Sequence, residues 1–181
     1  MTAIDFRDIL EPVQLAISVI VPFSGVLAVT GRRRPGPLTP RLLAAYGLAA
    51  GCALAGVLVA AIVTVWSGGA WPSASRLAVL VAGSVLVQLI AQSVGTACGL
   101  LVRRPRIAMA ATIVVPMGVT VVLAAIDSGL VRWLTPYGNA QALLAGRPTA
   151  ALAVVGLLWC VVPNVVGARL RTSLSSGSLT I

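Results

Sequence analysis

Residues 42–66 read LLAAYGLAAGCALAGVLVAAIVTVW, a run of 25 residues without a charged side chain. About 20 apolar residues are enough for an α-helix to cross the hydrocarbon core of a bilayer. Strands that span a membrane alternate lipid-facing and lumen-facing side chains, whereas this run is apolar throughout. Backbone groups in lipid must be paired within their own segment, so the run predicts a transmembrane helix.

The rest of the chain has the same character. Of its 181 residues, 59% are hydrophobic and 9% are charged, whereas a soluble domain has about 25% charged residues. So few polar side chains cannot cover a surface that faces water. We therefore predict an all-α, polytopic integral membrane protein with about five transmembrane helices in a single domain, residues 1–181. The predicted spans are residues 12–30, 42–66, 77–102, 107–126 and 150–168.

The charged residues predict an orientation. All thirteen basic residues are arginines, and nine of them fall in three alternate connections that contain no acid: residues 31–41, 103–106 and the tail. The other connections hold four arginines and all four acids. Because cytoplasmic loops carry the excess of positive charge, we expect the N-terminus outside and the C-terminus in the cytoplasm. Asp8 and Glu11 are interpreted as solvated groups of an N-terminal turn.

The longest connection, residues 127–149, is apolar in part but interrupted by proline and glycine. Tyrosine and tryptophan favour the membrane interface, so we predict short re-entrant helices on the external side before the last span. The residues that indicate this region are Trp133, Pro136, Tyr137 and Asn139. The small, polar residues 172–181 are interpreted as a flexible tail.

The third predicted span contains polar side chains at four-residue spacing: Gln88, Gln92 and Thr96. This spacing puts them on one face of a helix, and Gly95 and Gly99 form a GxxxG pattern on an adjoining face. Such residues pack helices together in membranes, but they can also line a polar path for a substrate. Both interpretations stay open at this point.

Chemistry within this chain is not expected. There is no histidine, the acids lie at predicted external ends, and no Walker motif for ATP is present. The three cysteines each lie in an apolar run, without metal-ligand spacing. We predict no catalytic residue, no metal site and no cofactor in this chain.

Several stretches resemble the membrane permease subunit of ABC-2-type exporters, in the family's order. Residues 19–34, VIVPFSGVLAVTGRRR, are similar to its second span and the cytoplasmic segment that follows. Residues 40–50, PRLLAAYGLAA, resemble the start of its third span, and residues 94–116 resemble the turn between its fourth and fifth spans. Residues 133–146 and 156–172 are similar to its external re-entrant helices and last span. Family members usually have six spans, so this chain is expected to lack the first.

The resemblance implies a transport function. Two permease subunits, identical or different, would dimerise in the bacterial cytoplasmic (inner) membrane and export a substrate. A separate cytoplasmic ABC ATPase would bind ATP and Mg²⁺ and grip the permease through the connection between the family's second and third spans. In this sequence that coupling loop maps to Arg32, Arg33, Arg34 and Arg41.

Other functions compete with this one. The alternative is a non-transporting accessory or immunity subunit that binds other membrane helices. The arginines of residues 31–41 are also a topology signal near anionic lipid headgroups. Nucleic acid is not an expected partner, because a short loop held between two spans leaves little room for a duplex.

Overall fold

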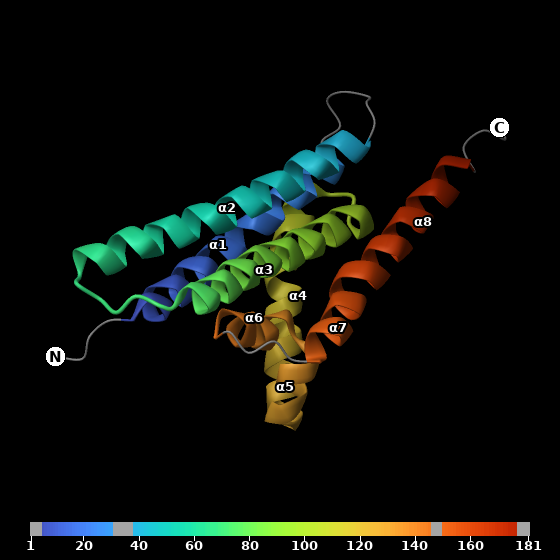
Figure 1. Cartoon of the computed structure of the whole chain (residues 1–181). Coiled ribbons are helices and arrows are strands. Elements are labelled where there is room, and N and C mark those ends of the chain that lie inside the picture. The colour runs from blue at the N-terminus through green and yellow to red at the C-terminus, as the bar shows by residue number, and fades with distance from the viewer. Residues whose placement is uncertain (1–4, 31–37, 146–149, 177–181) are drawn as a thin grey trace.

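The fold is a bundle of helices. A computed structural model describes residues 5–30, 38–145 and 150–176 and contains no β-strand among them, which confirms the all-α prediction. The elements are α1 (Phe6–Thr30), α2 (Leu38–Trp66), α3 (Ala74–Leu101), α4 (Pro105–Ile126), α5 (Ser128–Leu134), α6 (Pro136–Leu144), α7 (Ala151–Val155), the π-helix η1 (Gly156–Val161) and α8 (Val162–Ser176) (Figure 1).

Five segments are long and apolar enough to cross a membrane: α1, α2, α3, α4 and the continuous run Ala151–Arg171. Their outward faces are apolar, as on α2, where the Leu58 side chain is 61% exposed, and on α4, where Val114 is 65% exposed. A soluble monomer rarely exposes apolar surface so extensively. The prediction of a multi-pass membrane protein with about five spans is confirmed.

Several helices begin a few residues before the predicted spans, and two boundaries differ most from the sequence prediction. Helix α1 begins at Phe6 and not near residue 12, because Phe6 and Leu10 are fully buried against Ala60 and Leu80. The first turns of α1 are therefore packed on one side, not a wholly solvated turn. Helix α8 runs to Ser176, so the first part of the predicted tail is helical, while residues 177–181 lie outside the described residues.

The packing core consists of α1, α2 and α3 (Figure 1). Helices α1 and α3 run parallel, since Gln14 of α1 contacts Gln88 of α3 and Gly25 lies against Thr96 further along both helices. Helix α2 lies antiparallel to both. Helix α8 packs on α3, and α4 crosses the bundle and is the least buried of the spans.

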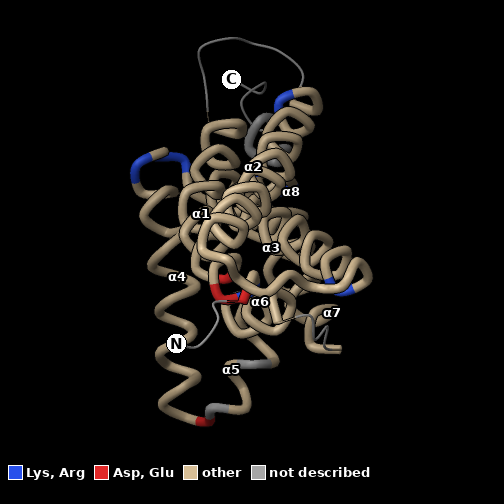
Figure 2. The backbone as a smooth tube through the Cα atoms, turned by 60° about the vertical axis from the view of Figure 1, so that its left-hand side comes forward, with Lys and Arg blue, Asp and Glu red and all other residues tan. Residues whose placement is uncertain are grey.

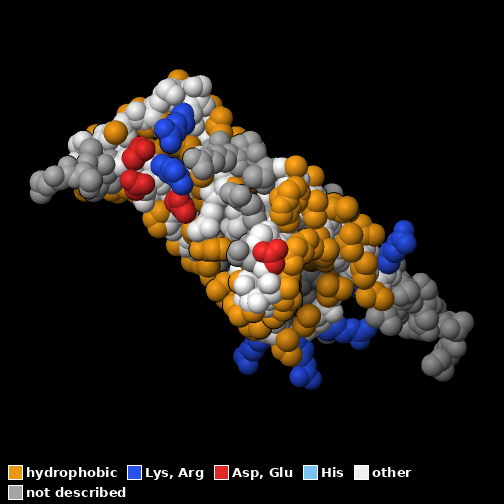
Figure 3. Space-filling view, turned by 90° about the horizontal axis from the view of Figure 1, so that it is seen from below, with side chains coloured by type: hydrophobic (Ala, Val, Ile, Leu, Met, Phe, Trp, Pro, Cys, Tyr) orange, Lys and Arg blue, Asp and Glu red, His pale blue; other side chains and the backbone are white. Residues whose placement is uncertain are grey.

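The charged residues separate along the bundle. In Figure 2 the acidic residues lie away from the C-terminus, whereas most arginines lie at the end of the bundle where the C-terminus is found. We call these the acidic end and the basic end. Apolar side chains cover most of the surface between them in the view of Figure 3. The described arginines of the basic end are Arg41, Arg103, Arg104, Arg106, Arg169 and Arg171.

Candidate functional site

The polar stripe of α3 faces the interior of the bundle. Gln88 and Gln92 are fully buried, and Thr96 is 2% exposed. Ser84, one turn earlier, is also buried and donates to the Leu80 carbonyl of its own helix at 2.8 Å. A polar side chain in a low-dielectric interior is costly unless it is hydrogen-bonded, so the partners of these side chains determine their role.

Gln88 joins α3 to α1 and, through Gln14, to α2. Its Nε2 donates to the backbone oxygen of Gln14 at 2.9 Å and to Gln14 Oε1 at 3.0 Å. Gln14 Nε2 in turn donates to the Ala53 carbonyl at 2.8 Å. Gln14 is itself fully buried. This glutamine pair therefore links three helices, and Gln14 is a partner that the sequence pattern did not identify.

Gln92 makes a second connection to α1. With its amide turned so that both ends are satisfied, its nitrogen donates to Ser24 Oγ at 2.8 Å and to the Val21 carbonyl at 2.9 Å. Its oxygen then accepts from the Gly25 amide at 3.1 Å. Val21, Ser24 and Gly25 all lie next to Pro22, which cannot donate a backbone hydrogen bond of its own. Gln92 thus pairs with backbone and side-chain groups of α1 close to Pro22.

Thr96 connects α3 to the last span. Its Oγ1 donates to Asn164 Oδ1 at 2.8 Å, and Asn164 Nδ2 donates to the Ser93 carbonyl at 3.0 Å and the Cys160 carbonyl at 2.7 Å. Asn164 follows Pro163, which cannot donate a backbone hydrogen bond, and η1 precedes it. The Asn164 amide, one residue after Pro163, therefore ties the last span to α3.

The glycines of α3 allow close contact with α1. A Cβ on Gly95 would collide with the Pro22 carbonyl oxygen, and a Cβ on Gly99 would lie 3.0 Å from Val26 Cα. On α1, a Cβ on Gly25 would lie 2.8 Å from the Thr96 nitrogen. Small residues at such positions let helix backbones approach each other in membranes. In this chain, the polar stripe and the GxxxG pattern make helix–helix contacts.

A cavity of about 250 Å³ lies between α1, α3, α4 and α6. Its wall contains no charged residue. The hydroxyls of Ser18 and Thr112 in the wall donate to carbonyls of their own helices, each at 2.7 Å. The cavity therefore presents hydrocarbon surface, which suits an apolar guest and not a hydrophilic one. Pro22, Pro116 and Pro136 also line it.

The two short helices predicted before the last span are present. Asp127 caps α5 by accepting from the Gly129 amide at 2.8 Å, and Thr135 caps α6 by accepting from Gly138 at 3.3 Å. Pro136 occupies the first turn of α6, where a missing N–H costs nothing. A Cβ on Gly83 would lie 2.9 Å from the Leu143 carbonyl oxygen. Gly83 lies nine residues after Ala74, the first residue of α3. At the rise of an α-helix, α6 therefore contacts α3 roughly 13 Å from the start of α3.

The four residues that marked this region have different surroundings. Trp133 and Tyr137 are about half exposed, and Asn139 is buried, with its Nδ2 donating to the Thr135 carbonyl at 3.1 Å. Tyr137 and Pro136 line the cavity. Sequence reasoning missed Trp159 of η1, whose Nε1 donates to the Leu134 carbonyl at 2.8 Å and so joins the last span to the end of α5.

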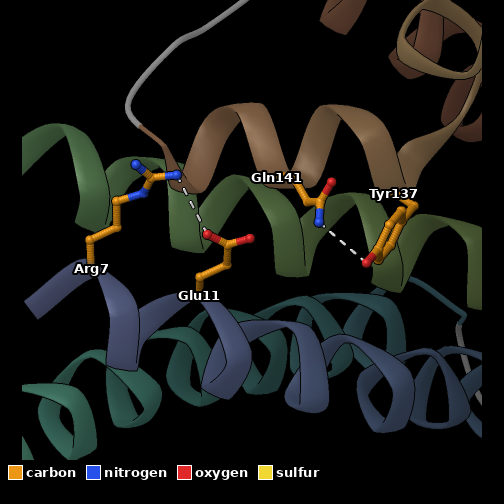
Figure 4. Close-up of polar contacts among 4 residues, drawn as sticks. All are labelled: Arg7, Glu11, Tyr137 and Gln141. Carbon is orange, nitrogen blue, oxygen red and sulfur yellow. Dashed lines mark hydrogen bonds and ion pairs between the residues drawn. The ribbon is translucent and has the colours of Figure 1, made fainter. Parts of the chain in front are cut away.

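Helix α6 lies over the first turns of α1. Figure 4 shows the Arg7 guanidinium at the C-terminal end of α6, where a cation is favourable. Arg7 forms an ion pair with Glu11 at 3.6 Å, and Gln141 Nε2 donates to the Tyr137 hydroxyl at 3.3 Å. These four side chains are at least partly exposed, and Tyr137 also lines the apolar cavity.

Of the four arginines of the predicted coupling loop, the structure describes one. Arg32, Arg33 and Arg34 lie outside the described residues, and Arg41 is half-buried in the first turn of α2. Arg103, Arg104 and Arg106 are exposed at the turn between α3 and α4. Among the described residues, no three His, Cys, Asp or Glu side chains are grouped closely enough to hold a metal ion.

Comparison of the chain with protein-family models, with curated proteins and with solved structures gave no match.

Proposed function

We propose that this chain is the membrane-spanning permease subunit of an ATP-driven exporter, working with a second permease subunit and a separate cytoplasmic ATPase. ATP and Mg²⁺ would bind to the ATPase and not to this chain. The proposal rests on the resemblance in sequence and on the five-span architecture. It places the protein in the bacterial inner membrane.

The separation of charge between the acidic end and the basic end is the observation that best supports the proposal. The described part of the basic end has six arginines, while the four acids of the chain all belong to the other end. An excess of positive charge orients a membrane protein, and it also attracts a soluble partner with an acidic surface. A cytoplasmic ATPase is the partner that the sequence resemblance supplies.

The resemblance assigns the contact with the ATPase to Arg32, Arg33, Arg34 and Arg41. Helix α1 ends at Thr30 and α2 begins at Leu38, so this loop joins two helices of the packing core. A force on the loop would act directly on α1 and α2. We therefore propose this loop as the coupling element.

The interior of the bundle favours a substrate path that is formed between two subunits and not within one chain. The polar groups of α3 bond to α1 and α8, and the cavity is apolar. Neither feature forms a hydrated route through one copy. A path for the substrate would therefore need the second subunit, as in the proposed dimer.

The proposal is tested by ATPase turnover in the complex purified from its native host. The variant Arg32→Gln/Arg33→Gln/Arg34→Gln should still insert into the membrane, but stimulation of ATP hydrolysis by the permease should be lost. The matched control is Arg103→Gln/Arg104→Gln/Arg106→Gln, which removes the same charge from the other cytoplasmic connection and should retain most stimulation. Unchanged turnover in the first variant would overturn the coupling assignment. Absence of any bound ATPase would favour the accessory or immunity role.

A further inference from the structure

Arg171 of α8 makes contacts unlike those expected of a topology marker. Its Nε donates to the Leu100 carbonyl at 3.2 Å, its Nη1 donates to the Val29 carbonyl at 3.2 Å, and its Nη2 donates to the Gly99 carbonyl. All three guanidinium nitrogens therefore bond to backbone oxygens. The side chain is partly buried and lies across the ends of two other helices.

The three carbonyls belong to the last turns of α1, which ends at Thr30, and α3, which ends at Leu101. The last four carbonyls of a helix have no partner within the helix. In α3 the Cys98 carbonyl is satisfied by the Val102 amide, and the next two carbonyls along the chain bond to Arg171. One side chain thus satisfies acceptors that two helices leave open.

Electrostatics favours a cation at this place. Helices α1 and α3 run parallel, so the negative ends of both helix dipoles lie together and repel each other. They are also close, because a Cβ on Gly99 would lie 3.0 Å from Val26 Cα. A planar guanidinium with several donors bridges such a pair of ends better than a lysine ammonium does.

The approach of α8 is matched to this contact. A Cβ on Gly167, one turn before Arg171, would lie 2.6 Å from Leu100 Cβ. Only a residue without a side chain lets α8 come this close to α3. Asn164, one turn earlier again, bonds to the same helix through Thr96 and Ser93. The last span is therefore anchored on α3 at successive turns, and Arg171 extends the anchor to α1.

We propose that Arg171 is a positioning residue that clamps the last span to the C-terminal ends of α1 and α3, the two helices that precede the arginine-rich connections. Residues 31–37 follow α1, and Arg103 and Arg104 follow α3. The clamp rests on the proposed function in so far as the first of these connections is the coupling loop. The contacts themselves are independent of that role.

The clamp is tested by hydrogen exchange on the full chain in detergent or nanodiscs. Arg171→Gln should raise amide exchange in the last turns of both α1 and α3 by about tenfold, the factor expected from losing a hydrogen bond to a charged group. Arg106→Gln is the matched control, because it removes the same charge from an exposed position at the same end of the bundle. It should leave both turns unchanged. Raised exchange confined to α8, or an equal effect of both variants, would overturn the clamp.

A conservative variant separates geometry from charge. Arg171→Lys keeps the positive charge but not the planar fork, so it should restore only part of the protection in α1 and α3. If amide exchange in α1 and α3 of Arg171→Lys equals that of the native chain, the planar guanidinium is not required for the clamp.

The positioning role is tested in the complex with its ATPase. Arg171→Gln should leave the amount of bound ATPase unchanged and lower its stimulated turnover at least threefold, because the loop is present but misplaced. The positioning role would be overturned if Arg171→Gln lost its bound ATPase. It would also be overturned if Arg171→Gln kept native turnover although its amide exchange in α1 and α3 was raised. If no ATPase is bound to the native chain, the proposed function fails, while the exchange experiment still decides on the clamp.

Discussion

Gln88 Nε2 donates to both the backbone oxygen and the side-chain oxygen of Gln14, at 2.9 and 3.0 Å, with both side chains fully buried. The two residues lie on parallel spans, separated by 74 positions in the chain. In lipid there is little hydrophobic force between helices, so hydrogen bonds and close packing determine which helices meet. The glutamine pair therefore helps to specify the contact between α1 and α3.

We predict that Gln88→Leu lowers the free energy of unfolding by about 1 kcal/mol, since interhelical hydrogen bonds in membranes contribute amounts of this order. The effect is limited because leucine also removes Gln88 Oε1, which has no partner among the described residues. The measurement is reversible unfolding in detergent or bicelles. The exposed Gln141 is the control, and Gln141→Leu should change stability by less than about 0.5 kcal/mol. A double-mutant cycle with Gln14→Leu should give a coupling energy above zero, and additive effects would refute the pairing.

The close contact of α1 and α3 gives a second prediction. Gly95→Ala should lower the free energy of unfolding by about 1–3 kcal/mol, because the added methyl group collides with the Pro22 carbonyl and must separate the helices. Gly51→Ala in α2 is the control, since nothing lies within 4 Å of a Cβ built there. This change should leave stability unchanged or slightly raised. Equal behaviour of the two variants in unfolding experiments would contradict the packing at Gly95.

The sequence was sufficient to predict the spans and the polar face of α3. Long uncharged runs must be helical in lipid, and glutamines at four-residue spacing must share a face. It was not sufficient to identify Gln14 or the contact of Asn164 with α3, because a single polar residue in a span has no pattern until its partner helix is known. Arg171 was assigned to the tail after the last span, whereas it lies within α8. Arginines that face water and arginines that bridge carbonyls look alike in sequence. The start of α1 at Phe6 depends on burial against α2 and α3, which no local signal reveals.

Trp159 gives a third prediction. Trp159→Phe keeps an aromatic ring but leaves the Leu134 carbonyl without the indole donor at 2.8 Å. We expect a loss of about 1 kcal/mol, the usual net contribution of a hydrogen bond, together with faster amide exchange in α5. Trp133→Phe, in α5 itself, is the control because the Trp133 side chain is half exposed. Exchange in α5 that is equal in both variants would argue against the link between η1 and α5.

The orientation of the bundle remains a prediction that labelling can test. In a background without the three native cysteines, Ser73→Cys and Ala3→Cys should react with an impermeant thiol reagent on intact cells. Arg103→Cys should react only after the membrane is opened. The bridge between Asp5 and Ala70 supports a common side for the first pair, since it joins the start of α1 to the connection before α3. The reverse labelling pattern would invert the topology and move the proposed coupling loop outside the cell.

The central claim is that this chain couples to an ATPase on another polypeptide. The most direct test is to purify the tagged chain from its native host in mild detergent and identify the proteins that co-elute with it. We predict a stoichiometric subunit with Walker motifs, and ATP hydrolysis in the purified complex. A chain that elutes without any ATPase, or only with other membrane proteins, would contradict the exporter assignment and favour an accessory role.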